Sequence, residues 1–263
     1  MNSVRVLILR TAGTNCDLET AHAFERAGAE VDLVHINRLK LHEVVLASYH
    51  IFAIPGGFTY GDDIAAGKIL ANELRRFIFD EISQFIAQGR LVLGICNGFQ
   101  VLVKAGLLPD PANADGPQQV TLTYNDSGRF EDRWVWLRVV NGDRCVFTRG
   151  IGHLLHMPVA HAEGKFIAKE STVLQRLQTA GSITFEYVHP EGRPADYPWN
   201  PNGSIGGIAG ICDASGRILG LMPHPERHVD PTQHPRWTRE GLKHEGDGLV
   251  IFRNAVEFAR KHL

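Results

Sequence analysis

The chain has 263 residues, of which 44% are hydrophobic and 21% charged, and its formal net charge is −2 at pH 7. This length and composition are typical of a soluble globular protein with a full core, and the balanced charge argues against nucleic acid or an anionic membrane as the main partner. No segment is long enough to span a bilayer and residues 1–9 lack a signal-cleavage pattern, so we expect a cytoplasmic protein.

The first 105 residues alternate short apolar runs with helical patterns. Strands are predicted at residues 4–9, 31–36, 51–55 and 91–95, and helices at residues 18–27, 68–88 and 99–105. Helices that alternate with buried strands predict a mostly parallel sheet. Because reactive groups gather at the carboxyl ends of such strands, we expect residues 11–17, residues 56–67 and the turn at Cys96 to share one rim.

The second half of the chain is richer in strands. They are predicted at residues 120–124, 134–140, 154–159 and 183–187, with a helix at 172–177 and a hairpin formed by 208–212 and 218–222. The polar segment 228–246 predicts a surface loop, and residues 249–262 predict a closing helix with one apolar face made by Phe252, Ala255, Val256 and Ala259. We therefore predict an α/β fold of three layers: a mostly parallel central sheet flanked by helices, with an added antiparallel strand region.

The candidate nucleophile is Cys96, in Gly94-Ile95-Cys96-Asn97-Gly98. A buried strand followed at once by a helix forces one residue into a strained turn, which is the arrangement of a nucleophile elbow. Unpaired N–H groups at the start of the helix favour a thiolate at that turn. The alternative is a small buried cysteine beside a tight turn.

A thiol needs a base, and the best candidate follows the strand predicted at residues 218–222. This is His224 in Pro223-His224-Pro225-Glu226. In an extended backbone, residues two apart point the same way, so Glu226 can fix the tautomer of His224, while Pro225 keeps the stretch from becoming helical. The alternative is a loop histidine beside a surface glutamate.

Attack by a thiolate on a carbonyl makes an oxyanion. The backbone N–H groups of Asn97, in the elbow, and of Gly57, in Pro55-Gly56-Gly57-Phe58, are placed to receive it on the same rim. The alternative for the second motif is a plain glycine turn.

A glycine loop, then a cysteine elbow, then a distant His-Pro-Glu run together resemble the class I glutamine amidotransferases. The resemblance implies one flavodoxin-like, type 1 amidotransferase domain over residues 1–263, in which Cys96 attacks the side-chain amide of L-glutamine. It also implies that His224 protonates the departing ammonia, that Glu226 orients this base, and that water hydrolyses the glutamyl thioester. Gln100 matches a family position that holds the substrate glutamine, and His161 resembles another.

Within this class, four runs resemble the glutaminase subunits of phosphoribosylformylglycinamidine synthases: residues 13–17, 55–62, 94–100, and 200–204 together with 208–211. The resemblance implies that ammonia passes through a tunnel to an ATP-dependent synthetase subunit, which converts formylglycinamide ribonucleotide to formylglycinamidine ribonucleotide in purine biosynthesis. A small accessory subunit is implied as well. No cofactor is expected in this chain, with ATP and Mg on the partner, which should face the rim at residues 56–67 and Cys96. The chain departs from the family at Ala162, where glycine is usual.

Other functions stay open on the sequence. One is the glutaminase subunit of another class I amidotransferase, feeding for example a pyridoxal phosphate or imidazole glycerol phosphate synthase. Another is a noncatalytic interaction subunit of the same fold, against which the intact set of Cys96, His224 and Glu226 argues. A serine-type hydrolase is disfavoured because the elbow carries a thiol.

Several other polar groups lack the pattern of a site. Residues 61–68 miss the spacing of a phosphate loop by one residue, and no dinucleotide fingerprint is present. The residues His224, His228, Asp230, His234 and His244 lack a metal-ligand spacing, so we predict no metal site. The cysteines form no CxxC pair; they are Cys16, Cys96, Cys145 and Cys212. Cys16 is expected to be structural, with Asp17 as a helix N-cap, and Asp62 and Asp63 to be solvated loop charges.

Overall fold

The computed structural model describes residues 3–263, and they form one nine-stranded sheet in the order β2-β1-β3-β4-β11-β10-β9-β6-β7. The first five of these strands are parallel, and the last four pair in antiparallel fashion. The strands span β1 Arg5–Arg10, β2 Glu30–His35, β3 Ile51–Ile54, β4 Leu91–Ile95, β6 Glu131–Val139, β7 Leu155–His161, β9 Ile183–Val188, β10 Ile208–Cys212 and β11 Ile218–Leu221. The predicted fold class is confirmed, including the hairpin of β10 and β11.

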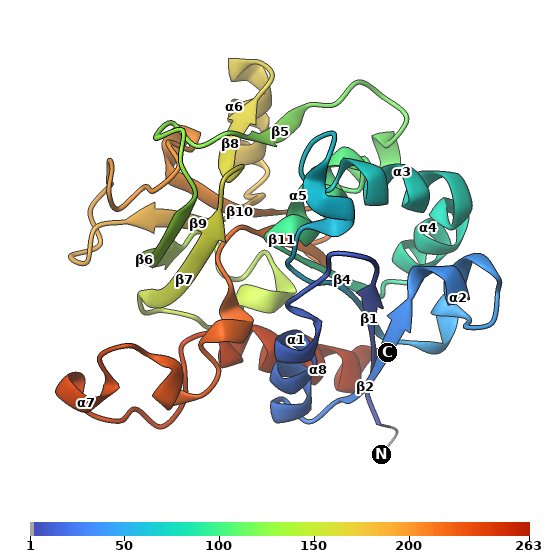
Figure 1. Cartoon of the computed structure of the whole chain (residues 1–263), viewed down its shortest axis with the longest axis horizontal. Coiled ribbons are helices and arrows are strands. Elements are labelled where there is room, and N and C mark those ends of the chain that lie inside the picture. The colour runs from blue at the N-terminus through green and yellow to red at the C-terminus, as the bar shows by residue number, and fades with distance from the viewer. Residues whose placement is uncertain (1–2) are drawn as a thin grey trace.

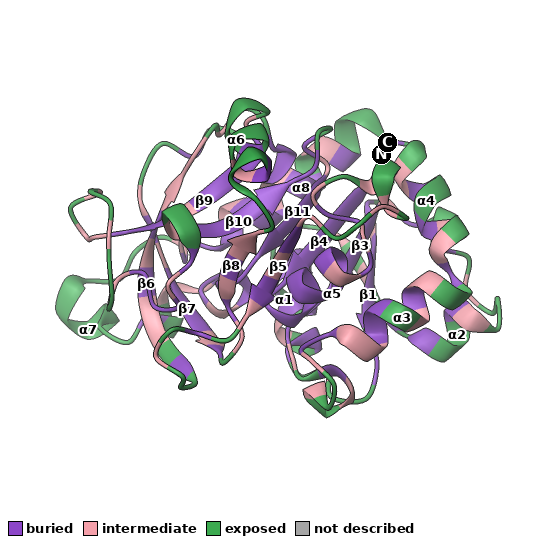
Figure 2. Cartoon of the chain, turned by 90° about the horizontal axis from the view of Figure 1, so that it is seen from above, coloured by how far each residue is buried: buried purple, intermediate pink, exposed green. Residues whose placement is uncertain are grey.

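Helices cover both faces of the sheet (Figure 1). On one side lie α1 (Asp17–Arg26) and α8 (Leu249–His262), joined by an edge-to-face contact of Phe24 and Phe252 with ring centroids 4.9 Å apart. On the other side lie α3 (Lys68–Phe77) and α5 (Asn97–Lys104). The strands between them, β3 and β4, are buried at every position, which explains their unbroken apolar runs (Figure 2). As predicted, α8 buries the face made by Phe252, Ala255, Val256 and Ala259.

Some elements differ from the sequence-based expectation. The single helix expected at residues 68–88 is two helices, α3 and α4 (Phe79–Ala87), because Ile78 leaves the helical region with φ −136° and is itself buried. Two further helices are α2 (Ile36–Lys40), which was not predicted, and α6 (Ser171–Thr179). A separate two-stranded sheet pairs β5 (Val120–Thr123) with β8 (Lys165–Ala168), and β8 was also not predicted. Within residues 3–263, no helix is both long and apolar enough to cross a membrane.

The segment at residues 228–246 is more than the surface loop that its polarity predicts. It contains the short helix α7 (Trp237–Glu240), which projects from the lower left of the molecule in Figure 1. However, His228 and His234 are buried, because both rings pack against Trp134 of β6 at centroid distances of 5.0 and 4.9 Å. This segment therefore rests on the antiparallel half of the sheet.

The carboxyl ends of the parallel strands meet at one rim, as expected. The loop after β1 is tied to the loop after β3 by an isolated bridge between Thr14 and Gly57, and the N–H of Cys16 donates to Gly56 O at 3.2 Å. Since β4 lies between β3 and β11, the residues that follow these three strands come together with the β1 loop.

Candidate active site

Cys96 occupies the junction between β4 and α5. It has φ 50° and ψ −105°, a conformation that costs a non-glycine residue roughly 1–3 kcal/mol. Its N–H donates to Leu221 O of β11 at 2.8 Å, and its side chain is nearly buried at the N-cap of α5. The predicted geometry of a strand, a strained turn and a helix is therefore present.

His224 and Glu226 follow β11, the neighbour of β4 in the sheet. The imidazole Nδ1 lies 2.6 Å from Glu226 Oε1, and both side chains are buried. The backbone that joins them is a 3-10 turn at Pro225–Arg227, so the extended conformation expected here is wrong although the contact itself forms. The N–H of His224 donates to Pro158 O of β7 at 2.9 Å, and the thiol of Cys96 donates to Ala160 O at 3.7 Å. One strand therefore supports both the base and the thiol.

The environment of His224 favours its protonated form. Burial acts to lower the pKa of His224, but the carboxylate of Glu226 and the thiols of Cys96 and Cys16 outweigh it and hold this pKa well above the usual value. The Nε2 atom has no hydrogen-bond partner among the described residues. The ring thus presents a free Nε2 on the edge opposite Glu226, which suits a donor of protons to a leaving group.

A second thiol, Cys16, lies on the same edge of the imidazole as Glu226. Its Sγ is 3.9 Å from Nδ1 of His224, which is already bonded to Glu226. Burial and the nearby carboxylate raise the pKa of the Cys16 thiol, which disfavours a thiolate. Cys16 itself is the N-cap of α1 and Asp17 is the first helical residue, so the expectation of Asp17 as N-cap is wrong. Cys96, in the strained turn at the N-terminus of α5, therefore remains the better candidate nucleophile.

Cys16 also belongs to the one close set of potential metal ligands in the described part of the chain, which consists of Cys16, His224 and Glu226. A zinc ion needs donors about 2.0–2.3 Å from the metal, so a nitrogen and an oxygen 2.6 Å apart leave it no room without moving. The guanidinium of Arg227, 3.2 Å from the sulfur, also repels a cation. We therefore assign the set to acid–base chemistry.

The N–H groups of Gly57 and Asn97 are free to bind an oxyanion, because neither donates to another group in residues 3–263. Gly57 has φ 153°, and a Cβ at this position would lie 2.6 Å from Gly13 O, so only glycine fits. The side chain of Asn97 accepts a hydrogen bond from the Thr59 hydroxyl at 2.7 Å, which fixes the loop after β3 against the elbow. The oxyanion role of the two N–H groups stays a prediction.

Gln100 and His161, the predicted substrate-binding residues, are both engaged within the protein. Gln100 Nε2 donates to Glu163 O at 2.6 Å, and Asn97 Nδ2 donates to Gln100 Oε1 at 3.0 Å. Burial lowers the pKa of His161 to about 3, so the ring is neutral. Its nitrogens face Asn125 Oδ1 at 3.2 Å and Asn202 Nδ2 at 3.5 Å. Their contact with glutamine stays a prediction.

Comparison with known proteins agrees with this geometry. A model of the CobB/CobQ-like glutamine amidotransferase domain matches residues 3–259. A phosphoribosylformylglycinamidine synthase subunit PurQ from Dehalococcoides mccartyi is 54% identical over 262 residues, which cover 99% of this chain and 100% of the relative. The chain belongs to the PurQ family of glutamine amidotransferases. A second PurQ, from Methanococcus maripaludis, is 45% identical over 98% of both chains.

A solved structure of PurLQS from Thermotoga maritima has the same fold as this PurQ family member. Its matching chain is 30% identical with a TM-score of 0.74, and the match covers 98% of this chain and 99% of the other. The relatives and this chain are therefore similar over their full lengths.

Three residues around the site were missed in the sequence analysis. Asn125 and Asn202 hold the ring of His161, and Asn202 Nδ2 also donates to the hydroxyl of the buried Tyr187 at 3.3 Å. Asn202 lies in the run 200–204 that carried the family resemblance, so a signal was present; Asn125 and Tyr187 had none. Asp62 is also more than a solvated loop charge, because its carboxylate accepts from Asn97 Nδ2 at 3.1 Å and from Gly67 N at 3.0 Å.

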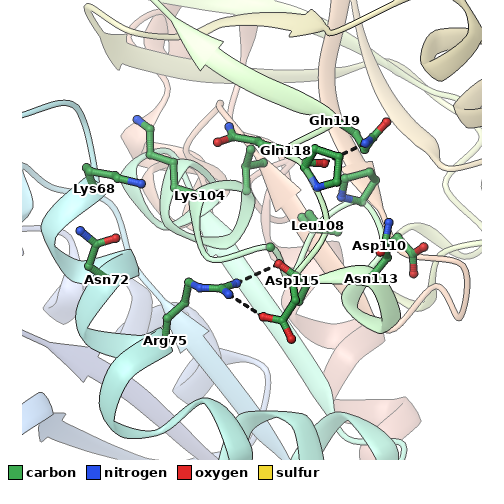
Figure 3. Close-up of a pocket in the computed structure, with 16 residues that line it drawn as sticks. Lys68, Asn72, Arg75, Lys104, Leu108, Asp110, Asn113, Asp115, Gln118 and Gln119 are labelled. Atoms are coloured by element: carbon green, nitrogen blue, oxygen red, sulfur yellow. Dashed lines mark hydrogen bonds and ion pairs between the residues drawn. The ribbon is translucent and has the colours of Figure 1, made fainter.

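A separate cavity of about 250 Å³ lies beside α3 and α5 (Figure 3). Its lining includes Lys68, Lys104 and Arg75, and Arg75 is bonded to Asp115 at 2.7 Å and to the carbonyl of Ala114 at 2.9 Å. The lining contains none of the residues predicted for catalysis, so we do not connect this cavity with the reaction.

Proposed function

We propose that the protein is the glutaminase subunit of a phosphoribosylformylglycinamidine synthase. The observation that carries the proposal is the buried His224, which is bonded through Nδ1 to Glu226, has a free Nε2 and follows the strand paired with β4, so that the strained Cys96 acts on its imidazole. The identity of 54% to a subunit of that enzyme supports the choice of complex.

The reaction uses one glutamine and one water to give glutamate and ammonia. The sulfur of Cys96 attacks the side-chain amide carbon, and the resulting oxyanion receives hydrogen bonds from the N–H groups of Gly57 and Asn97. His224 donates its proton from Nε2 to the amide nitrogen, which leaves as ammonia when the C–N bond breaks. A water molecule then gives a proton to the neutral His224 and attacks the thioester carbon; the C–S bond breaks, which releases glutamate and returns the thiolate of Cys96 beside the protonated His224. Gln100 and His161 would lie beside the bound glutamine.

Ammonia released in this way needs an acceptor. We propose that a synthetase subunit, carrying ATP and Mg, uses it to convert formylglycinamide ribonucleotide to formylglycinamidine ribonucleotide, and that a small accessory subunit completes the complex. The structure of PurLQS from Thermotoga maritima supports such an assembly. Cytoplasmic location follows as part of the same proposal.

A glutaminase assay of the full chain, with and without the synthetase and its acceptor, tests the proposal. Cys96→Ala should lower glutamine-dependent synthesis by about 10³-fold or more, because no other residue supplies the thioester. Synthesis from added ammonium salt by the same complex should be unchanged and serves as the control. Retention of glutamine-dependent synthesis by Cys96→Ala would refute the mechanism.

Covalent labelling separates this proposal from a noncatalytic subunit of the same fold. A chloroketone or diazo analogue of glutamine should label Cys96 once per chain, and excess glutamine should protect it. Absence of labelling, together with no glutaminase activity in the complex, would favour the noncatalytic subunit.

A further inference from the structure

Cys16 is a buried thiol that the mechanism above does not use, and it touches the catalytic base. Its backbone is fixed from two sides: its N–H donates to Gly56 O at 3.2 Å, and its carbonyl accepts from the hydroxyl of Thr20 at 2.6 Å. Only 1% of the residue is exposed. The sulfur therefore has a fixed place at the junction of the β1 loop, the β3 loop and the turn after β11, where α1 meets that turn (Figure 1).

The sulfur and Gly56 form two sides of a slot for the imidazole of His224. The distance from Cys16 Sγ to Nδ1 of His224 is 3.9 Å. A Cβ on Gly56 would lie 2.7 Å from Cε1 of His224 and 3.1 Å from Cys16 Sγ, so the slot has no spare volume. The edge of the ring that carries Nδ1 is thus held by packing as well as by Glu226.

The carboxylate of Glu226 has only one partner in this slot. Its Oε1 bonds to His224, whereas Oε2 is buried and has no partner among residues 3–263. A strong donor at Oε2 would draw charge away from the hydrogen bond to Nδ1 and weaken the hold on the proton of His224. A thiol fills the space beside the carboxylate but is a weak donor.

Arg227, which follows Glu226 in the chain, is such a strong donor, but its guanidinium bonds to other groups. Its Nη2 bonds to Cys16 Sγ at 3.2 Å and its Nε to Glu19 Oε1 at 3.2 Å. The thiol, in turn, donates to Asn15 Oδ1 at 3.1 Å. The sulfur and Glu19 thereby hold the guanidinium, and no ion pair joins it to Glu226 within residues 3–263.

We propose that Cys16 is a positioning residue for the catalytic base: its thiol packs the imidazole of His224 and keeps the guanidinium of Arg227 off the carboxylate of Glu226. The proposal rests on the glutaminase function proposed above. We expect serine, the closest isostere, not to replace it, because its smaller oxygen packs the imidazole less well and a hydroxyl is a stronger donor near the carboxylate of Glu226, which lies within 4.8 Å of the sulfur.

The test is the pH profile of glutamine hydrolysis by the full chain in complex with the synthetase. Cys16→Ser should lower kcat about tenfold and shift the alkaline limb to lower pH by about half a unit or more, with KM for glutamine changed less than about twofold. The matched control is Cys145→Ser, at a thiol that is equally buried but lies elsewhere in the core. It should leave the profile unchanged even if it lowers the melting temperature.

A double-mutant cycle tests the part played by the guanidinium. In the Arg227→Gln background, Cys16→Ala should lose most of its effect on kcat, because no guanidinium remains to reach Glu226. Glu19→Gln, which breaks the same ion pair without touching the sulfur, controls for the loss of that pair. Fully additive effects of the two substitutions would overturn this part of the proposal.

The outcomes separate this proposal from the proposed function. An active wild-type complex in which Cys16→Ser has the wild-type profile overturns the positioning role alone. A wild-type complex without glutaminase activity, or an active Cys96→Ala, overturns the function itself. If Cys16→Ser fails to fold, the pH profile of Arg227→Gln tests the proposal instead. The alkaline limb of this variant should stay in place or move to higher pH. A shift of the limb to lower pH would overturn the proposal.

Discussion

At the scale of the residue, the decisive feature is how the proton of His224 is held. Burial opposes the charge on this ring, but Glu226 and the two flanking thiols raise its pKa well above the ordinary value of 6.5. Because the folded-state pKa exceeds the unfolded one, this pair stabilises the fold fully below pH 6.5, and the contribution is lost as pH rises through the folded-state pKa. The proton needed for ammonia is therefore present at neutral pH.

Glu226→Gln should reveal this effect in the kinetics. The amide keeps the shape of the side chain but removes the charge, so burial dominates and His224 loses its proton at lower pH. We expect kcat at neutral pH to fall by about 10²–10⁴-fold and the alkaline limb of its pH profile to move to lower pH. An unchanged limb, measured over the same range as the wild type, would contradict the role of Glu226.

At the scale of the element, the segment at residues 228–246 is fastened to the sheet by a cluster of histidines. His156 Nδ1 lies 2.9 Å from His234 Nε2, and His228 Nδ1 lies 2.7 Å from His156 O. Burial and the neighbouring His234 lower the pKa of His156 to about 4. Since only the turn Pro225–Arg227 separates His228 from His224, this cluster also anchors the catalytic base.

This cluster predicts a loss of stability in acid. Between pH 6.5 and about 4 the unfolded chain protonates His156 and the folded chain does not, so the free energy of unfolding falls as pH falls, by up to about 1.4 kcal/mol per pH unit for one histidine. We expect His156→Gln to reduce the difference between the free energies of unfolding measured in urea at pH 7 and at pH 5. His244→Gln, at an exposed histidine, is the control and should leave it unchanged. An equal change in the free energy of unfolding between the two pH values for His156→Gln and the wild type would contradict this role of His156.

At the scale of the whole molecule, the rim beside Cys96 carries exposed apolar side chains. Ile64 is 72% exposed and Phe58 45% exposed, and the ring of Phe58 lies 6.2 Å from that of Phe130, itself 49% exposed. Apolar side chains gathered beside a reactive group are typical of a surface that a partner covers. That the synthetase faces this rim stays a prediction, and these side chains offer a way to test it.

Ile64→Asp should weaken the complex. A buried aspartate at such a contact would lower affinity for the synthetase by about tenfold or more, a difference of about 1.4 kcal/mol. Calorimetric titration and glutamine-dependent synthesis measure it, while synthesis from ammonium salt should persist. Leu41→Asp, at an equally exposed leucine after α2, is the matched control. Equal affinity for both variants would place the partner elsewhere.

Local patterns were sufficient for much of this protein. The unbroken apolar run of β4 followed by Cys96 predicted a strained turn before a helix. This was possible because the hydrophobic periodicity of a strand or helix depends on residues that are close together in the chain. The break at Ile78 could not be predicted in this way, since it depends on how two helices pack on one sheet. The burial of His228 and His234 was missed for a similar reason: it depends on Trp134, about a hundred residues away in the chain.

The sequence by itself determined most of the strands and helices, though not α2, β8 or the break between α3 and α4. It also determined the elbow at Cys96 and the pairing of His224 with Glu226, because these depend on residues close together in the chain. Only the tertiary structure decided that Cys16, Gly56 and Arg227 surround the same imidazole. Those residues follow three different strands, and no local periodicity records which loops meet where parallel strands end side by side.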